Sequence, residues 1–217
     1  MQASKVLGRD VKEYKWGWDV DEKFVENPDS TWDVNDQFDY RLKIVNLAKW
    51  RVCFPNAMSA LLSRTAVFSA DDFKYLKGLR KLHLNGNSSI TDAAFENLRG
   101  INTLDMSYCG RITDAAFQYL RGINTLDMSL CAQITDAAFV NLCGINTLTM
   151  RHCAQITDAA FENLRGINTL DVSWCTQITD AAFENLRGIN TLSMNGCSKS
   201  QVAAAKRVPG IRSLLYK

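Results

Sequence analysis

The chain repeats itself at a fixed interval of 22 residues between positions 78 and 187. Five consecutive units are near copies; the second reads GINTLDMSYCGRITDAAFQYLR (100–121) and the fifth GINTLDVSWCTQITDAAFENLR (166–187). A fixed period of this length indicates a solenoid. Such a stack of small units presents one long face, which usually binds other macromolecules. The repeat therefore constrains both the fold and the plausible functions.

Each unit has the pattern of a short strand followed by a short helix. In the unit at 100–121, Leu104 and Met106 alternate with polar residues, which is the period of a strand with one buried face. Thr113 and Asp114 then offer a side chain that caps a helix. Gly122 stands where a helix C-terminus commonly needs a left-handed residue. One unit cannot bury its own apolar side, so the array must fold cooperatively.

The pattern L-x-L-x-x-C-x-x-I-T-D-x-x-F-x-x-L resembles the leucine-rich repeat, and more narrowly its cysteine-containing class, best known from substrate-recognising F-box proteins. The resemblance covers residues 78–209. It implies an α/β solenoid shaped as a horseshoe, with parallel strands on the concave face and short helices on the convex face. It does not imply an enzyme.

The array is expected to extend beyond its five regular repeats. FSADDFKYLKG (68–78) matches ITDAAFENLRG position by position, so residues 56–77 are interpreted as a degenerate first repeat with a strand near 59–62. Residues 188–217 keep INTLSMNGC but lose ITDAAF, and are interpreted as a C-terminal cap. The repeat array thus spans 56–217, preceded by an irregular or helical N-terminal capping segment at 1–55.

The capping segment is the least regular part of the chain. Residues 36–54 are apolar enough to pack, and Phe38, Leu42, Val45 and Lys49 have helical spacing. We expect a helix over 36–54, although RLKIV (41–45) also fits a strand. An F-box would be expected to open with Leu-Pro and to continue as a long apolar helical pattern. Neither is visible here.

Composition favours a soluble globular protein, with 47% hydrophobic and 22% charged residues. The net charge of +2, without a basic run, argues against a nucleic-acid partner. No run of 18 apolar residues suggests a membrane span, and the N-terminus lacks the apolar core of a signal peptide. We expect an intracellular protein, cytoplasmic or nuclear, that is a monomer without a membrane partner.

Five of the seven cysteines recur at the repeat interval. They are Cys109, Cys131, Cys153, Cys175 and Cys197. Leucine-rich repeats elsewhere hold Asn at this place, where it ties down the loop after the strand, so we expect buried, reduced thiols here. A metal ladder is the alternative, but ligands supplied once per repeat do not converge on a point. We therefore expect no metal and no cofactor.

Catalytic motifs are not evident. The sequence has no glycine-rich phosphate loop, no GxSxG and no HExxH. His152 precedes Cys153, but neighbouring strand side chains point to opposite faces. The Asp of each ITD recurs in every unit, which predicts a helix-capping role rather than a catalytic one. We expect no catalytic residues and no enzyme.

The copies differ mainly just after the strand residues, at the fifth, seventh and eighth places counted from the glycine. We expect these side chains to point away from the buried ones and to line the concave face and its edge. The candidate partner-binding residues are Asp105, Tyr108, Asp127, Leu130, Thr149, Arg151, His152, Asp171 and Trp174.

An exposed Trp with Tyr, Arg and His nearby is typical of a binding hot spot. The alternative is that drifting repeats accept any residue where packing is indifferent. The sequence therefore predicts a non-catalytic protein–protein interaction scaffold. A second hypothesis is a substrate-recognition subunit of a ubiquitin ligase, with a divergent N-terminal adaptor-binding segment.

Overall fold

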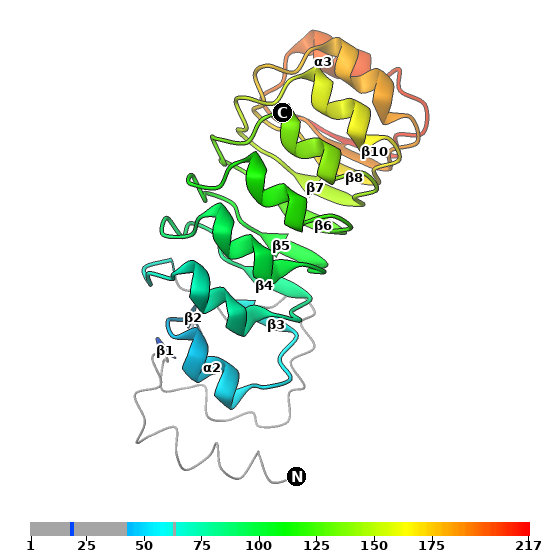
Figure 1. Ribbon diagram of the computed structural model, residues 1–217. Helices are drawn as coiled ribbons and strands as arrows, with labels where there is room; N and C mark the ends of the chain where they lie inside the picture. The colour runs from blue at the N-terminus through cyan, green and yellow to red at the C-terminus, as the bar shows by residue number, and fades with distance from the viewer. Residues whose placement is uncertain (1–17, 20–42, 63) are drawn as a thin grey trace.

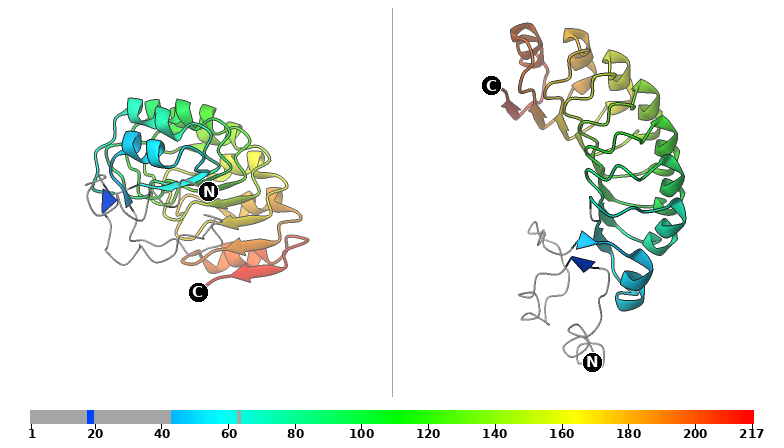
Figure 2. Two further views of the ribbon diagram at one scale, coloured as in Figure 1. Left: turned by 90° about the horizontal axis from the view of Figure 1, so that it is seen from below. Right: turned by 90° about the vertical axis from the view of Figure 1, so that its left-hand side faces the viewer.

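The computed structural model describes residues 18–19, 43–62 and 64–217. Within them, strands β3 to β10 form one parallel sheet of eight strands in chain order (Figure 1). The chain forms a curved solenoid, with the strands on its inner side and the helices on its outer side (Figure 2). The strands are β3 (Ser59–Leu61), β4 (Lys81–His83), β5 (Thr103–Asp105), β6 (Thr125–Asp127), β7 (Thr147–Thr149), β8 (Thr169–Asp171), β9 (Thr191–Ser193) and β10 (Ser213–Leu215).

The helices between the strands are short 3-10 helices. They are η2 (Ala70–Leu76), η3 (Asp92–Leu98), η4 (Asp114–Tyr119), η5 (Asp136–Asn141), η6 (Asp158–Leu164) and η7 (Asp180–Leu186), and α-helix α3 (Lys199–Ala205) follows β9. Each of these helices has only six or seven residues, as in η3 and η4, and such short segments commonly form 3-10 helices. A left-handed glycine follows each regular one, such as Gly122 at φ 81°. The predicted leucine-rich-repeat architecture is confirmed.

Neighbouring strands pair in register, one period apart. Leu104 lies opposite Leu126, and Asp105 opposite Asp127. Equal places of successive repeats therefore form columns across the sheet. The middle leucine of each regular strand is buried, and its two neighbours belong to the concave face.

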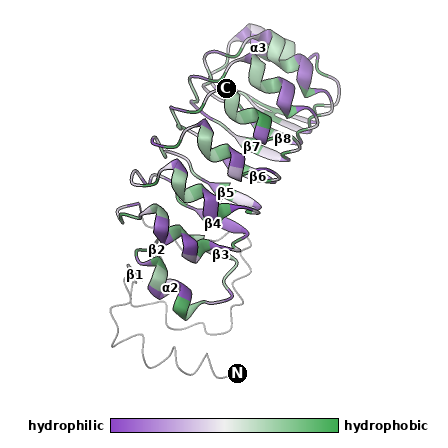
Figure 3. Cartoon of the chain, in the orientation of Figure 1, coloured by the Kyte–Doolittle hydropathy of each residue, from purple (hydrophilic) through white to green (hydrophobic). Residues whose placement is uncertain are grey.

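The core is one continuous strip between the sheet and the outer helices. Each helix from η2 to η7 buries one phenylalanine completely or nearly so, from Phe73 to Phe183. Figure 3 shows hydrophobic and hydrophilic residues side by side on the outer helices, as expected when only the inner side is buried. No described helix is long and apolar enough to cross a membrane.

The ITD residues join successive repeats. Asp92 accepts hydrogen bonds from the backbone N–H and Oγ1 of Thr113 in the next repeat, at 2.8 and 2.6 Å. Asp114, Asp136 and Asp158 bind the following threonines in the same way. The N-cap residue is the threonine. At the start of η4, Thr113 Oγ1 accepts a hydrogen bond from the backbone N–H of Ala115. The aspartates were expected to cap the helices, and this is wrong: each is the first residue of its helix, and the carboxylates from Asp92 to Asp158 bond to the next repeat instead.

The N-terminal part differs from the single helix expected over 36–54. Strand β2 (Lys43–Ile44) pairs antiparallel with β1 (Trp18–Asp19), and helix α2 (Leu47–Cys53) starts only after it. The alternative strand interpretation of 41–45 therefore holds at 43–44. The expected helix face is also wrong where it can be seen, because Lys49 is exposed while Leu47 and Trp50 are buried. The expectations for 1–17 and 20–42 lie outside the described residues.

Candidate functional site

The eighth place of the repeat has a left-handed backbone throughout the array. Tyr108, Leu130, His152 and Trp174, hereafter the column, have φ angles of 61°, 60°, 56° and 63°. They are the non-glycine residues with positive φ among those the structure describes. Glycine occupies the same place in the flanking repeats, at Gly86 (φ 70°) and Gly196 (φ 72°). Bulky residues are uncommon in this region because their Cβ approaches the following carbonyl oxygen.

The turn that carries the column is held between repeats. The backbone N–H of Tyr108 donates to the carbonyl of Ser129 at 2.8 Å, and that of Trp174 to the carbonyl of Asn195 at 2.9 Å. The column therefore lies three residues beyond the strand end, at the edge of the concave face. From the sequence, the column was expected on the concave face or at its edge. The position of the turn places the column at the edge.

The side chains of His152 and Trp174 lean over the next repeat. His152 and Trp174 stack with ring centroids 5.6 Å apart and planes within 1°. The indole of Trp174 also covers Gly196, since a Cβ there would lie 2.4 Å from two ring carbons. Tyr108 and Trp174 nevertheless remain 60% and 52% exposed. The column is thus an ordered but open apolar surface.

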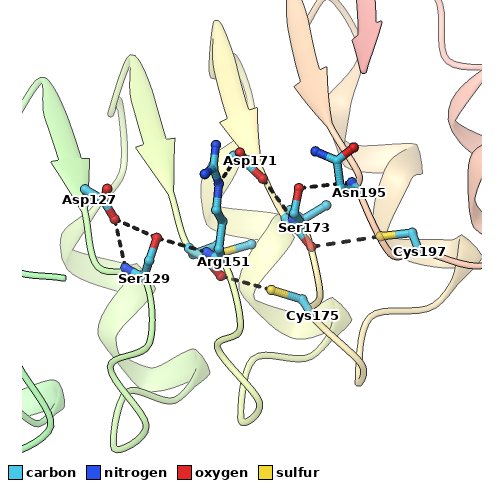
Figure 4. A network of polar contacts seen from close by, with 10 residues as sticks. Asp127, Ser129, Arg151, Asp171, Ser173, Cys175, Asn195 and Cys197 are labelled. Atoms are coloured by element: carbon cyan, nitrogen blue, oxygen red, sulfur yellow. Dashed lines mark hydrogen bonds and ion pairs between the residues drawn. The ribbon is translucent and has the colours of Figure 1, made fainter. Parts of the chain in front are cut away.

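The aspartates of the fifth place are tied to the serines of the seventh. Oδ1 of Asp105 accepts from the backbone N–H and the hydroxyl of Ser107, at 3.0 and 2.7 Å. Asp127 and Ser129 repeat this turn at 2.9 and 2.7 Å, and Asp171 accepts from the N–H of Ser173 at 2.9 Å (Figure 4). Such side-chain-to-backbone bonds fix a turn locally.

These bonds correct one expectation about the concave face. Ser107, Ser129 and Ser173 are buried, and Asp171 is only 6% exposed. The fifth and seventh places were expected to point into solvent. Instead, the aspartate draws the serine inward, and the Ser173 hydroxyl accepts from the N–H of Asn195 in the next repeat at 3.0 Å.

The second carboxylate oxygens have different surroundings. Oδ2 of Asp105 lies 3.4 Å from His83 Nδ1, and Oδ2 of Asp171 accepts from Arg151 Nε at 2.6 Å. Burial works to raise the pKa of Asp105, but hydrogen bonds from His83 and Ser107 outweigh it and lower that pKa. Burial raises the pKa of Asp127, and the charge of Asp105 adds to this effect.

A shallow depression of about 320 Å³ lies beside the column. It brings together six of the predicted residues: Tyr108, Asp127, Leu130, Arg151, His152 and Trp174. Asp105, Thr149 and Asp171 do not line it, whereas Ser107, Ser129, Ser173 and Asn195 do. Two sequence signals could have shown this arrangement. The Asp-x-Ser spacing is typical of a side-chain turn, and glycines at both ends of a bulky column indicate positive φ.

The cysteine column is structural. The thiol of Cys109 donates to the carbonyl of Leu84 at 3.3 Å, and that of Cys175 to the carbonyl of Met150 at 3.0 Å. Burial raises the pKa of Cys109 to about 11 and that of Cys131 to about 12, so neither is an activated nucleophile. Asn87 takes this place in the first regular repeat, and its Nδ2 donates to the carbonyl of Ala66 at 3.0 Å. The described residues contain no group of three metal-ligating side chains.

The comparisons with known proteins agree with this architecture. Residues 61–168 match the model of the BspA type leucine rich repeat region in six copies. The chain is a leucine-rich-repeat protein. Its repeats carry cysteine at the ninth place, from Cys109 to Cys197. No curated protein matches the sequence significantly.

Two solved structures share the leucine-rich-repeat fold. A chain of the Rad7–Elc1 complex of yeast is 18% identical with a TM-score of 0.59, over 78% of this chain and 51% of that one. A chain of the TLR13–ssRNA13 complex is 18% identical with a TM-score of 0.61, over 81% of this chain and 27% of that one. This leucine-rich-repeat chain therefore spans about half of the first and about a quarter of the second. At these identities the likeness shows the fold alone.

Proposed function

We propose that this leucine-rich-repeat protein is a non-catalytic scaffold that binds a protein partner through the column and the depression beside it. The observation that carries the proposal is the left-handed backbone beneath four bulky side chains, of which Tyr108, His152 and Trp174 are exposed and Leu130 is partly exposed. A non-glycine residue in this conformation costs about 1–2 kcal/mol. Gly86 and Gly196 show that the fold accepts glycine at the same turn.

Backbone strain and exposed aromatic surface are both unfavourable for an isolated protein. Local strain clusters at functional sites, and exposed apolar patches mark interaction surfaces. Tyr, Trp and Arg are the residue types enriched in binding hot spots. All three border this depression, as Tyr108, Trp174 and Arg151.

The comparisons favour binding over catalysis without naming a partner. Leucine-rich-repeat proteins generally act as binding scaffolds, and the two similar structures are complexes with Elc1 and with ssRNA13. In this chain, aspartates accompany the column and the net charge is only +2. These charges favour a protein over a nucleic acid, whose affinity would depend on basic side chains.

Glycine substitution gives a sharp test, because the turn accepts glycine. A variant with all four column residues changed to Gly should fold like the wild type by circular dichroism. Wild-type protein used as bait in a lysate should retain a partner that this variant loses. The matched control, Glu162→Gly with Glu184→Gly on the convex helices, should keep it. A partner retained equally by the column variant would contradict the proposal.

The ubiquitin-ligase hypothesis depends on residues 1–55, most of which lie outside the described residues. The likeness to a chain of the Rad7–Elc1 complex reflects the fold, so it does not favour this hypothesis by itself. The same capture distinguishes the two hypotheses. Recovery of ligase scaffold proteins that depends on residues 1–55, and not on the column, would favour the ligase subunit.

A further inference from the structure

Asp127 differs from the other two aspartates of the concave row, Asp105 and Asp171, in its electrostatic neighbours. In the part of the chain that the structure describes, His83 lies beside Asp105, and Arg151 is paired with Asp171. The hydrogen bonds to Asp127 come from Ser129, and both reach Oδ1. Asp127 is also the aspartate of the row that lines the depression.

The strands next to Asp127 place no cation opposite it. Asp105 lies opposite on β5, and Thr149 lies opposite on β7. Burial and the charge of Asp105 both raise the pKa of Asp127, so an incoming positive charge would stabilise its carboxylate.

The guanidinium of Arg151 does not take this role. Its charge lowers the pKa of Asp127, but its Nε donates to Asp171 at 2.6 Å. Figure 4 shows the Arg151 side chain directed at Asp171 rather than at Asp127. Arg151 is thus paired with the buried Asp171, and among the described residues no ion pair reaches Asp127.

We propose that the depression receives a lysine or arginine side chain of the protein partner, with Oδ2 of Asp127 as the acceptor. Tyr108 and Leu130 line the same depression and would contact the cation and its aliphatic stem. This inference rests on the proposed function and adds the chemistry of the partner. Charge complementarity carries it, since a partly buried carboxylate that forms no ion pair among the described residues selects for a cation.

Asp127→Asn is a conservative test. The Asn side chain keeps an oxygen that can accept both bonds from Ser129, and it replaces the available oxygen by an amide NH₂. The fold should therefore be preserved while the acceptor for a cation is lost. Glu162→Gln on the exposed convex side removes the same charge elsewhere and is the matched control.

The probe is a random peptide library displayed on phage and selected on the full-length protein. Peptides that need the column should carry Lys or Arg, and replacing that residue by Gln should weaken binding about tenfold or more. The Asp127→Asn variant should show the same weakening, with little further effect of the Gln replacement. Raised salt should weaken the basic peptides most.

Three results would overturn the inference in distinguishable ways. Column-dependent peptides without a basic residue, or with an acidic one directed at Arg151, would overturn the cation site and leave the proposed function standing. Basic peptides that bind the Asp127→Asn and wild-type proteins equally would do the same. Selected peptides that all bind the four-glycine column variant as tightly as the wild type would overturn both proposals.

Discussion

At the scale of single residues, the eighth place shows how one side chain constrains its neighbour in the next repeat. The Arg64 and Trp174 side chains lean toward the following turn, so the space there determines which residue that turn can hold. The indole of Trp174 occupies the position of a Cβ on Gly196, and the Arg64 side chain lies 3.0 Å from the corresponding position on Gly86. Glycine at these two places therefore allows the positive φ angle and also leaves space for the side chain from the preceding repeat.

Gly196→Ala should lower the free energy of unfolding by about 2–3 kcal/mol, because it adds a steric clash to a left-handed backbone. Gly78→Ala separates the two effects, since Gly78 also has positive φ but a Cβ there would meet nothing within 4 Å. Adding Trp174→Gly to the Gly196→Ala variant should remove the clash. It should therefore restore most of the extra loss in unfolding free energy that Gly196→Ala shows over Gly78→Ala. Urea denaturation of the wild type, Gly196→Ala, Trp174→Gly and the double variant gives the cycle, with Gly78→Ala as the control. Equal losses at Gly196 and Gly78, without rescue, would contradict this packing.

The buried thiols make the stability of the array sensitive to alkaline pH. Burial raises the pKa of Cys109 and Cys153 to about 11 and that of Cys131 and Cys175 to about 12, from 9.0. Above pH 9 the unfolded thiols lose protons that the folded ones keep. Their contribution is therefore fully present below pH 9, and the free energy of unfolding falls as pH rises from 9 to about 11.

Each such thiol should contribute a slope of about 1.4 kcal/mol per pH unit in this window. Urea denaturation between pH 7 and 10.5 measures the total slope. Cys131→Ala should reduce that slope by the share of one thiol, while a small cavity lowers stability at every pH. A slope unchanged by the substitution would show that Cys131 does not titrate on unfolding.

At the scale of secondary-structure elements, Arg51 connects helix α2 to the array by hydrogen bonds, in addition to the buried side chains of α2. Nε of Arg51 in α2 donates to the carbonyl of Tyr75 at 2.6 Å, and Nη2 donates to that of Lys77 at 3.1 Å. These carbonyls belong to the C-terminal end of η2, where a cation also complements the helix dipole. Nη1 reaches three further carbonyls, of Phe54, Pro55 and Ala57.

Arg51→Met should lower the free energy of unfolding by about 2–3 kcal/mol, because several carbonyls lose a charged donor at once. Lys at this position should recover only part of the loss, since an ammonium group cannot reproduce the planar fork. Arg80→Met is the control, because Arg80 is exposed and donates one 3.4 Å bond to Gly100. Similar melting temperatures for the Arg51 and Arg80 variants would contradict this role of Arg51.

At the scale of the whole molecule, the array is a chain of nearest-neighbour contacts with two ends. Every interior repeat is covered on both sides, and the terminal repeats depend on what covers their outer flank. At the N-terminal end, Ile44, Leu47 and Trp50 are buried in the same core as the repeats. The apolar strip is continuous from this end to α3, where Val202 and Ala205 are buried.

Deletion of residues 1–55 should cause aggregation or a large loss of thermal stability, because it uncovers the flank of η2 and β3. Thermal unfolding by circular dichroism and size-exclusion chromatography measure the two effects. If a protein starting at Asn56 stays monomeric and melts at the wild-type temperature, residues 1–55 do not act as a cap.

The sequence by itself determined which residues of successive repeats lie next to one another in this protein. A strict 22-residue interval fixes which residues become neighbours, so the buried leucines, the phenylalanines under the helices and the thiol column were all predictable. The same reasoning found most residues around the depression. Periodicity identifies the neighbours of a residue, but it does not specify backbone angles in the turns or which polar atoms pair.

The 22-residue interval does not decide those features, and the tertiary structure does. The left-handed backbone of Tyr108 and Trp174 accompanies amide bonds to the next repeat, and the burial of Asp171 follows from its bonds to Ser173 and Arg151. Among the described residues, Asp127 forms no ion pair because His83 pairs with Asp105 and Arg151 pairs with Asp171. The pairing of Arg151 with Asp171 and the burial of Asp171 arise where one copy differs from its neighbours, so the 22-residue pattern does not specify them.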